Sequence, residues 1–330
     1  MSKEPFYVTT PIYYVNGEPH IGTAYTTVAT DATARFARMD GRDVFFLTGM
    51  DEHGEKVAEA AAEHGMTPQE WCDSQVTQFT ELWRDLDITN DDFIRTTQPR
   101  HVKGVQDFMQ KLHDNGYLYK GTYDGYYCTP CETQFTEGDL VDGKCPDCGR
   151  EVKVIHEENW FFKLSEFGDK LLAYYDEHPN FIRPQIRENE IRSFIEGGMH
   201  DLSVSRTAFD WGIPLPFDPE HVTYVWVDAL INYLTALGYG SDDTTLLERF
   251  WPANFHFVGK DIIRFHCVIW PAMLMAAGME CPRHVFAHGF LMAADGSKMS
   301  KSKGNALYPR DLIERYGFCL LYTSDAADDK

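Results

Sequence analysis

The sequence has 330 residues, of which 43% are hydrophobic and 14% aromatic, enough for one large α/β domain with an insertion or for two modest domains. Its formal net charge of −21 argues against DNA binding and against indiscriminate RNA binding, so any RNA contact has to come from local basic patches. No apolar run reaches the roughly 18 residues that cross a bilayer, so we expect a cytoplasmic protein without membrane association. In that compartment, the eight cysteines favour metal ligands or free thiols over disulfides.

The first predicted unit is a strand, a loop and a helix. An apolar, β-branched run at residues 6–10 ends in a loop rich in Pro, Asn and Gly, and a helical pattern runs from His20 to about Met39. The N-terminus of such a helix presents unpaired N–H groups and partial positive charge, and Gly22 lets an anionic or nucleotide ligand approach the backbone. We therefore expect His20 to face a ligand, although a His-x-Gly pattern is not specific on its own.

A second buried strand is predicted at residues 44–48, followed by the polar stretch 49–54. Open α/β sheets place their ligand contacts just past the carboxyl ends of parallel strands, which makes Asp51 a candidate binding residue. The alternative is that Asp51 only caps the helix that starts near Glu55.

The remaining elements of the first part continue this α/β pattern. A capping box at residues 67–70, with proline at the first helical position, opens a helix that runs to about Leu86. A third strand is predicted at residues 93–97 and a helix at residues 100–115. Together these elements predict one half of a Rossmann-like parallel sheet, which we assign to residues 1–116.

The pattern changes at residues 117–213, where short aromatic-rich strands alternate with Pro and Gly turns. Two Cys-x-x-Cys knuckles lie here, and two knuckles make a closed tetrahedral site suited to Zn²⁺. The candidate ligands are Cys128, Cys131, Cys145 and Cys148. Four thiolates leave no open position, so we expect one structural zinc that folds an insertion with little core of its own. Redox chemistry or an unmetallated remnant is the alternative.

The second half of the sheet is predicted at residues 214–317. A strand that begins near Val222 turns into a helix that carries Tyr233, and a core strand at residues 254–259 precedes Asp261 and a helix at residues 262–277. Another strand at residues 284–289 leads into a loop rich in lysine, a pattern that by itself is typical of a solvated surface segment. Three strands, an insertion and two further βα elements predict a nucleotide-binding sheet that is split in the middle.

Two stretches together resemble a known pair of motifs. His20-Ile21-Gly22-Thr23 and Lys298-Met299-Ser300-Lys301-Ser302 are similar to the HIGH and KMSKS signatures of class I aminoacyl-tRNA synthetases, with Thr23 in place of the last histidine. The resemblance implies that both segments grip ATP across the switch between the two halves of the sheet, with Mg²⁺ on its phosphates. The implied ATP-binding residues are His20, Gly22, Thr23, Gly259, Lys298, Ser300 and Lys301.

The insertion resembles the zinc-bearing connective peptide of the methionyl-tRNA synthetases within that class. Residues 48–54 are similar to the family's Thr-Gly-x-Asp-x-His-Gly segment, in which the aspartate holds the substrate's amino group; Met50 departs from the threonine common there. The resemblance also implies an aromatic cavity that favours an unbranched, polarisable thioether, although aromatic residues at helical spacing are otherwise usually core. The implied methionine-binding residues are Ile12, Tyr14, Asp51, Trp226, Ala229, Tyr233, Phe265, His266 and Trp270.

The reaction that the resemblance implies needs no protein nucleophile. The carboxylate of L-methionine attacks the α-phosphorus of ATP, pyrophosphate leaves, and a ribose hydroxyl of tRNA(Met) then takes the methionyl group. Catalysis is expected to depend on positioning and on charge stabilisation. The implied catalytic residues are His20, Lys298, Lys301, Asp261 and Arg206. For Arg206, at the end of a strand expected at residues 201–206, a surface salt bridge is the alternative.

The resemblance covers about residues 5–317. Residues 318–330 are predicted to be a tail foreign to the family, such as translated adapter sequence, and the family's anticodon-binding domain is expected to be absent. Such a chain is expected to activate methionine while charging tRNA poorly. A synthetase for valine, isoleucine, leucine or cysteine would share the ATP motifs but need another pocket. A nucleotidyltransferase with another acceptor would leave the zinc insertion and Asp51 unexplained, and a non-catalytic zinc-ribbon module would bind RNA without ATP.

Overall fold

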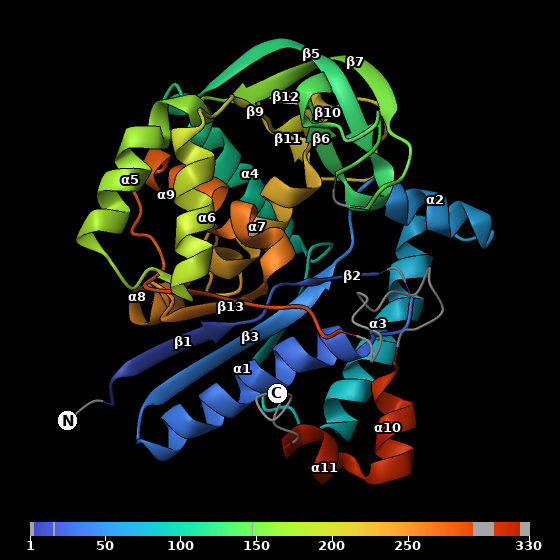
Figure 1. The fold of residues 1–330 in the computed structure, drawn as a ribbon, viewed down its shortest axis with the longest axis vertical. Helices are drawn as coiled ribbons and strands as arrows, with labels where there is room; N and C mark the ends of the chain where they lie inside the picture. Colours follow the sequence, from blue (N-terminus) through green and yellow to red (C-terminus); the bar gives the residue numbers. More distant parts are fainter. Residues whose placement is uncertain (1–2, 16, 147, 293–306, 324–330) are drawn as a thin grey trace.

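A parallel sheet crosses the middle of the molecule (Figure 1). The computed structural model describes residues 3–15, 17–146, 148–292 and 307–323. The strand order of the sheet is β2-β3-β1-β13-β14-β8, and β4 also pairs with β3. The strands are β1 (Pro5–Thr9), β2 (Tyr13–Tyr14), β3 (Asp43–Asp51), β4 (Asp92–Arg95), β8 (Ile182–Arg183), β13 (Phe255–Gly259) and β14 (Val285–His288). All of these pairings are parallel, which confirms the predicted Rossmann-like α/β fold.

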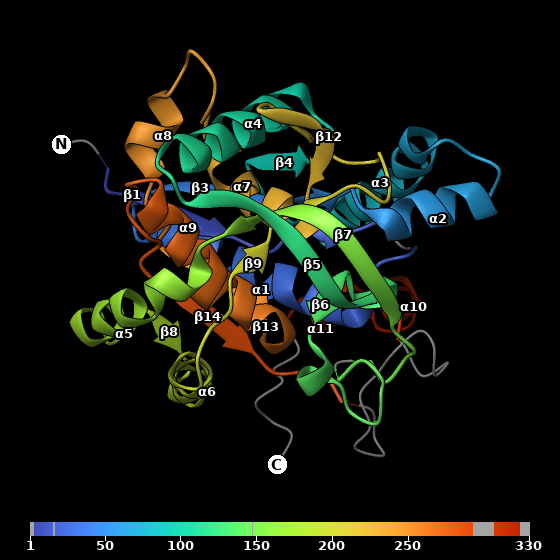
Figure 2. The ribbon, with the colours of Figure 1, turned by 90° about the horizontal axis from the view of Figure 1, so that it is seen from above.

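Helices cover both faces of the sheet, as Figures 1 and 2 show from two directions. On one face α1 (Ile21–Met39) packs against β1, β3 and β13. On the other lie α4 (Pro99–Asp114), α7 (Val225–Thr235) and α9 (Trp270–Ala276). The remaining helices are α2 (Glu55–Glu63), α3 (Pro68–Asp85), α5 (Gly168–Glu177), α6 (Gln185–Glu196), α8 (Thr245–Phe250), α10 (Pro309–Tyr316) and α11 (Phe318–Thr323).

The central strands bury side chains on both faces because helices lie on both sides. On β1, Phe6 and Val8 belong to the cluster beneath α1, whereas Tyr7 joins the larger cluster on the opposite face. This alternation follows from the two-residue period of a strand. It explains why these strands read as nearly continuous apolar runs in the sequence.

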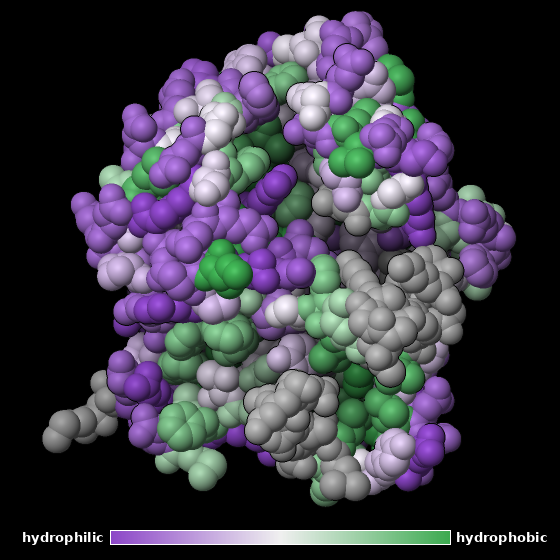
Figure 3. Space-filling model, in the orientation of Figure 1, coloured by the Kyte–Doolittle hydropathy of each residue, from purple (hydrophilic) through white to green (hydrophobic). Residues whose placement is uncertain are grey.

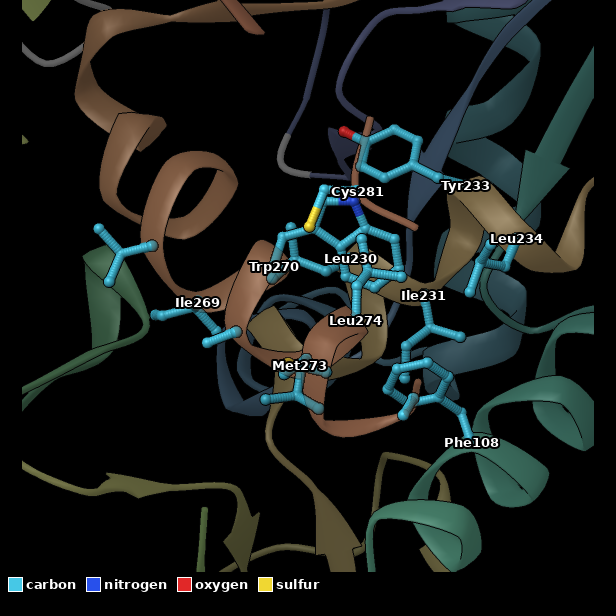
Figure 4. Packing of buried hydrophobic residues seen from close by; sticks show 14 of the residues in the cluster. Phe108, Leu230, Ile231, Tyr233, Leu234, Ile269, Trp270, Met273, Leu274 and Cys281 are labelled. Atoms are coloured by element: carbon cyan, nitrogen blue, oxygen red, sulfur yellow. The ribbon is translucent and has the colours of Figure 1, made fainter. Parts of the chain in front are cut away.

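The largest hydrophobic cluster joins α4, α7 and α9 to the sheet. Figure 4 shows the packing of its fully buried side chains, including Phe108 of α4, Ile231 of α7 and Met273 of α9. Full burial of a side chain of this size contributes roughly 1.5–3 kcal/mol to folding. Gly104 lets α4 approach α7 closely, because a Cβ at this position would lie 2.4 Å from Cγ2 of Thr235. The helices that carry the predicted pocket therefore sit on a densely packed support.

The insertion and the ten residues that follow it form two small antiparallel sheets, with the orders β6-β5-β7-β9 and β10-β12-β11. The long pair β5 and β7 arches over one end of the molecule (Figures 1 and 2). The strands are β5 (Leu118–Cys128), β6 (Thr133–Phe135), β7 (Lys153–Phe162), β9 (Leu202–Ser203), β10 (Ser205–Arg206), β11 (Pro214–Leu215) and β12 (Asp218–Thr223). Short 3-10 helices accompany them at Thr129–Cys131, Glu137–Asp139 and Leu164–Phe167.

Several observed elements differ from the sequence-based expectation. The strand expected at residues 201–206 is divided, because β9 pairs with β7 whereas β10 pairs with β12. The strand expected near Val222 is β12, which joins the small sheet and not the central one. Conversely, β8 lies within the segment 117–213 but pairs with β14 at the edge of the central sheet. These pairings join residues far apart in sequence, which local patterns do not report.

The helix expected at residues 262–277 is also more irregular than its pattern suggests. It begins with a 3-10 turn at Lys260–Ile262 and contains a π-helical turn at Phe265–Ile269 before α9. Turns of this kind are frequent at functional sites. Its predicted end is borne out by Gly278, which has a φ of 68°.

The last described helix, α11, lies in the segment that we predicted to be a foreign tail. Its Tyr322 hydroxyl donates a hydrogen bond to Oδ2 of Asp31 on α1, at 2.5 Å. The guanidinium of Arg35 lies 5.6 Å from the centroid of the same ring.

Across the described ranges, no helix combines the length and the apolar character that crossing a membrane requires.

Candidate active site

A cavity of about 560 Å³ opens at the carboxyl ends of the central strands. The surface is recessed below the small sheets of the insertion in Figure 3. The cavity is lined by the loop at residues 11–14, the start of α1, Asp51 at the end of β3, the helix α7, and the residues that follow β13 and β14. Open α/β sheets bind ligands in this position.

One side of the cavity contains the candidate nucleotide-binding residues. His20 is the N-cap of α1, and its Nδ1 accepts a hydrogen bond from the backbone N–H of Gly22 at 3.1 Å. Thr23, in the first turn of α1, also lines the cavity. Gly259, the last residue of β13, and Asp261, just after the strand, line the same cavity. The N-terminus of α1, which is suited to bind an anion, and the end of β13 thus line one cavity.

The lysine-rich segment falls outside the described residues. This applies to Lys298, Ser300 and Lys301, so their predicted contacts with ATP stay predictions. The described chain on either side of this segment does reach the cavity, because Leu291 and Leu307 both line it. The carbonyl of Leu307 accepts a hydrogen bond from the backbone N–H of Ile21 at 2.9 Å, which ties it to the start of α1.

The other side of the cavity is aromatic. Seven of the nine predicted methionine-binding residues line it, and these are Ile12, Tyr14, Asp51, Trp226, Ala229, Tyr233 and His266. The remaining two stand behind the lining: Phe265 stacks on Trp226 with 3.9 Å between ring centroids, and Trp270 is fully buried beside Tyr233. The structure therefore brings the predicted set together and divides it into lining and support.

Tyr233 and His266 form a hydrogen-bonded pair in this pocket. The Tyr233 hydroxyl lies 2.7 Å from Nε2 of His266, and Nδ1 of His266 lies 3.0 Å from the carbonyl of Ile262. Burial lowers the pKa of His266 to about 4, so its ring is neutral at pH 7. If Nδ1 carries the proton, it donates to Ile262, and Nε2 then accepts from Tyr233. The His266 ring therefore adds no positive charge to the aromatic side of the cavity at neutral pH.

Asp51 supplies a carboxylate to the mainly apolar and aromatic pocket. It is buried, and its Oδ1 has no hydrogen-bond partner within the part of the chain that the structure describes. Burial, then the nearby carboxylates of Asp228 and Glu132, raise the pKa of Asp51 well above its usual range. An unsatisfied buried carboxylate oxygen is costly, and a cationic ligand group in the cavity would satisfy it.

A buried histidine–aspartate network behind Asp51 was not expected from the sequence. Asp228 on α7 lies 2.6 Å from Nδ1 of His53 and 2.6 Å from Nε2 of His101. Burial alone would raise the pKa of Asp228, but the two histidines hold it below its usual value. The three residues are separated by up to 175 positions, so no local pattern could have linked them.

Arg206 does not line the cavity. Its side chain is buried in the insertion, where Nε lies 3.0 Å from Oε2 of Glu157 and the guanidinium lies 4.1 Å from the centroid of the Tyr127 ring. The alternative considered for this residue, a salt bridge, is present, although it is buried and not at the surface. A catalytic role for Arg206 stays a prediction without support from its position.

The four predicted metal ligands form a single cluster. The Sγ atoms of Cys128, Cys131, Cys145 and Cys148 all lie within 4.8 Å of one another. The Cys128–Cys148 and Cys131–Cys145 sulfur distances are 3.6 and 3.9 Å. A tetrahedral Zn²⁺ with Zn–S distances of about 2.3 Å would place its sulfurs about 3.8 Å apart. The donor set and its spacing therefore fit zinc.

Comparison with known proteins agrees with this geometry. The sequence matches the model of the family described as tRNA synthetases class I (M) over residues 6–154 and 148–322, which includes the first five residues of the predicted tail. A methionine–tRNA ligase of Caldanaerobacter subterraneus is 56% identical over 96% of this chain, and one of Thermotoga maritima is 55% identical over 94%. These alignments cover 49% and 50% of the relatives, so the chain spans about half the length of the curated proteins it matches.

Solved structures show the same relationship. Mycobacterium tuberculosis methionyl-tRNA synthetase in complex with methionyl-adenylate superposes with a TM-score of 0.92 at 48% identity, covering 96% of this chain and 64% of that one. The ligand-free form of the same enzyme gives a TM-score of 0.82, covering 97% and 61%. The family match extends over nearly the whole sequence, and the fold and the four-cysteine insertion agree with it. The chain therefore belongs to the class I tRNA synthetases of the M family.

Proposed function

We propose that this chain is the catalytic part of a methionine–tRNA ligase, which uses ATP to convert L-methionine to methionyl-adenylate and then transfers the methionyl group to tRNA(Met). The observation that carries the proposal is the shared cavity. It joins the start of α1, suited to phosphates, to an aromatic pocket that contains one buried carboxylate, Asp51.

The pocket suits the side chain and the amino group of methionine. Trp226, Tyr233 and His266 offer aromatic surfaces, against which a polarisable thioether packs favourably. The unpaired oxygen of Asp51 would accept a hydrogen bond from the ammonium group. Phe265 and Trp270 would hold the lining in place from behind.

The chemistry then depends on position and charge. A carboxylate oxygen of methionine attacks the α-phosphorus of ATP. The bond between this phosphorus and the oxygen that bridges it to the β-phosphate breaks, and pyrophosphate leaves. His20 and the backbone N–H groups at the start of α1 would bind the phosphates, and Gly259 and Asp261 would hold the nucleotide. We expect two sources of positive charge to stabilise the leaving pyrophosphate. One is Mg²⁺ bound to the phosphates, and the other is the pair of ammonium groups of Lys298 and Lys301.

We also propose that the four cysteines hold one structural Zn²⁺. Four thiolates satisfy a tetrahedral ion, so the zinc would stabilise the fold of the knuckles and take no part in the chemical step.

In the second reaction, a ribose hydroxyl at the end of tRNA(Met) would attack the carbonyl carbon of the adenylate, and AMP would leave.

Amino-acid-dependent exchange of pyrophosphate into ATP tests the activation step. We expect L-methionine to support the fastest exchange among the twenty amino acids. Lys301→Ala should lower the maximal exchange rate by about 10²–10³, the range for loss of one charge-stabilising donor. Lys303→Ala, which removes a neighbouring charge outside the five-residue signature, should leave the rate within about twofold. A faster rate with another amino acid, or near-normal exchange in Lys301→Ala, would contradict the proposal.

A further inference from the structure

The residue that follows each cysteine knuckle has a positive φ, but only one of these two residues is a glycine. In the second knuckle Cys148 is followed by Gly149, which has a φ of 71°. In the first knuckle Cys131 is followed by Glu132, which has a φ of 51°. The left-handed region is readily adopted by glycine and is unfavourable for other side chains. Glutamate therefore occupies a position that glycine fits at lower conformational cost, and residues in such conformations often serve a function.

The Glu132 side chain is buried and fully engaged by its surroundings. Oε1 accepts a hydrogen bond from the backbone N–H of Lys56 at 2.8 Å, and Oε2 accepts one from the Tyr127 hydroxyl. Lys56 lies in the first turn of α2, and Gly54, the N-cap of that helix, has no side chain to cap it. Glu132 thus caps α2 from the insertion, 76 residues away.

The same carboxylate also reaches the aromatic pocket. The Tyr14 hydroxyl lies 3.1 Å from Oε1 of Glu132 and 2.9 Å from the carbonyl oxygen of His53. Tyr14 lines the cavity, and its one hydroxyl proton is shared between these two acceptors, which lie on the side of the knuckle and just past the end of β3. Gly54 makes this approach possible, because a Cβ there would lie 2.5 Å from the Tyr14 hydroxyl and 2.8 Å from Oε1 of Glu132.

The backbone of Glu132 makes a third connection. Its carbonyl oxygen accepts a hydrogen bond from the Tyr224 hydroxyl at 2.5 Å. Tyr224 is the N-cap residue of α7, the helix that carries Trp226, Ala229 and Tyr233. One residue of the first knuckle therefore contacts Tyr14 and the starts of two helices, α2 and α7.

We propose that Glu132 is a positioning residue that couples the four-cysteine knuckle to the methionine pocket by fixing Tyr14 and the N-terminus of α2. That the ligand is methionine rests on the proposed function. That Glu132 couples the knuckle to the pocket rests on the contacts described above. Glycine would suit the left-handed backbone of the knuckle, as at Gly149, so what the glutamate adds is its side-chain contacts with Lys56, Tyr14 and Tyr127.

Glu132→Gly is the variant that tests the coupling with the knuckle preserved. We expect the zinc content of the purified chain to stay at its wild-type value, because glycine suits the left-handed backbone. The KM for L-methionine in pyrophosphate exchange should rise about tenfold, while kcat and the KM for ATP change by less than twofold, because one anchoring bond of Tyr14 is lost. The Lys56 amide should exchange with deuterium faster, since its acceptor has been removed.

Two matched variants complete the test. Glu132→Gln keeps a carbonyl oxygen that can accept from Lys56 and Tyr14, and should restore most of the methionine KM and of the amide protection. Glu151→Gln removes an exposed carboxylate of the same insertion, paired only with Lys144 among its described salt bridges, and should leave every readout unchanged.

The coupling would be overturned if Glu132→Gly left both the methionine KM and the Lys56 exchange rate unchanged. It would also be overturned if Glu151→Gln raised the methionine KM and the Lys56 exchange rate as much as Glu132→Gly does. Loss of zinc from Glu132→Gly would also overturn it, because the residue would then serve the knuckle itself. If the wild-type chain shows no methionine-dependent exchange, the proposed function fails. The amide-exchange comparison, which needs no substrate, still decides whether Glu132 caps α2.

Discussion

Asp51 places a buried carboxylate on the mainly apolar and aromatic side of the cavity. The side chain lies at the end of β3, so the strand holds it in a fixed position. Behind it, the two oxygens of Asp228 are hydrogen-bonded to His53 and His101, whereas Oδ1 of Asp51 has no partner among the residues that the structure describes. If the proposed function holds, this oxygen is where the ammonium group of the substrate binds.

This arrangement predicts a pH-dependent affinity for methionine. Only ionised Asp51 attracts an ammonium group, and burial followed by the neighbouring carboxylates raises its pKa in the free protein. Methionine affinity should therefore weaken as the pH falls through this raised pKa. Asp51→Asn should weaken binding about 10- to 100-fold at high pH, the range for a lost charge-assisted hydrogen bond, and should remove this dependence on pH. Calorimetric titration with methionine at a series of pH values measures both effects.

The control for this prediction is Glu63→Gln, which removes an exposed carboxylate at the end of α2. Its affinity for methionine and the pH profile should match those of the wild-type chain. Wild-type affinity in Asp51→Asn, or an unaltered profile, would show that the amino group is bound elsewhere.

At the scale of elements, the pocket depends on the contact between α4 and α7. Tyr233 and Trp226 of α7 line the cavity, while the opposite side of this helix packs on α4 through Gly104. A Cβ at residue 104 would lie 2.4 Å from Thr235 Cγ2 and 2.8 Å from the carbonyl oxygen of Tyr239. The second of these atoms belongs to the backbone, so a rotamer change cannot relieve the contact.

Gly104→Ala is therefore expected to destabilise the fold, although alanine favours a helix over glycine by roughly 1 kcal/mol. We expect the free energy of unfolding to fall by about 1–2 kcal/mol because the two helices have to separate. Denaturation in urea measures the change. Lys103→Ala, at the exposed neighbouring position on α4, should stay within about 0.5 kcal/mol of the wild type. A stabilised Gly104→Ala would mean that the helix contact is looser than described.

Local patterns were sufficient for most of the elements that carry the site. The capping box at residues 67–70 predicted the start of α3, and His20 was predicted at the start of the helix that it caps. Short pieces were not predictable in this way. β8 has two residues, and it joins the central sheet because Phe181 and Val285 are brought together, with a hydrogen bond of 2.6 Å between their backbones.

At the scale of the molecule, the chain has a large core and a small cysteine cluster that depend on different forces. The central sheet and its helices are held by buried apolar side chains. The knuckles are held by a minor cluster of Cys128, Phe135 and Cys145, with little other buried apolar surface. Metal binding can supply the folding free energy that such a small cluster lacks.

Zinc removal should consequently open the knuckles and leave the sheet folded. We expect one zinc per wild-type chain by elemental analysis and markedly less in Cys145→Ser. In the variant, limited proteolysis should cut within residues 128–150, while the far-ultraviolet circular dichroism keeps most of its intensity. Cys319→Ser, which changes an exposed thiol outside the cluster, should keep the metal. A wild-type chain that is free of zinc, or global unfolding of Cys145→Ser, would contradict this division.

The sequence by itself determined the class of fold, the four-cysteine cluster and the identity of many residues in the cavity. It could do so because strands, helix starts and paired knuckles are written in patterns of a few residues, and because parallel strands bring their carboxyl ends to one edge. Only the tertiary structure decided that Phe265 and Trp270 stand behind the pocket, that Arg206 lies away from it, and that Glu132 reaches Tyr14. These contacts join residues that no local pattern relates, and they form only when the helices and the insertion pack on the sheet.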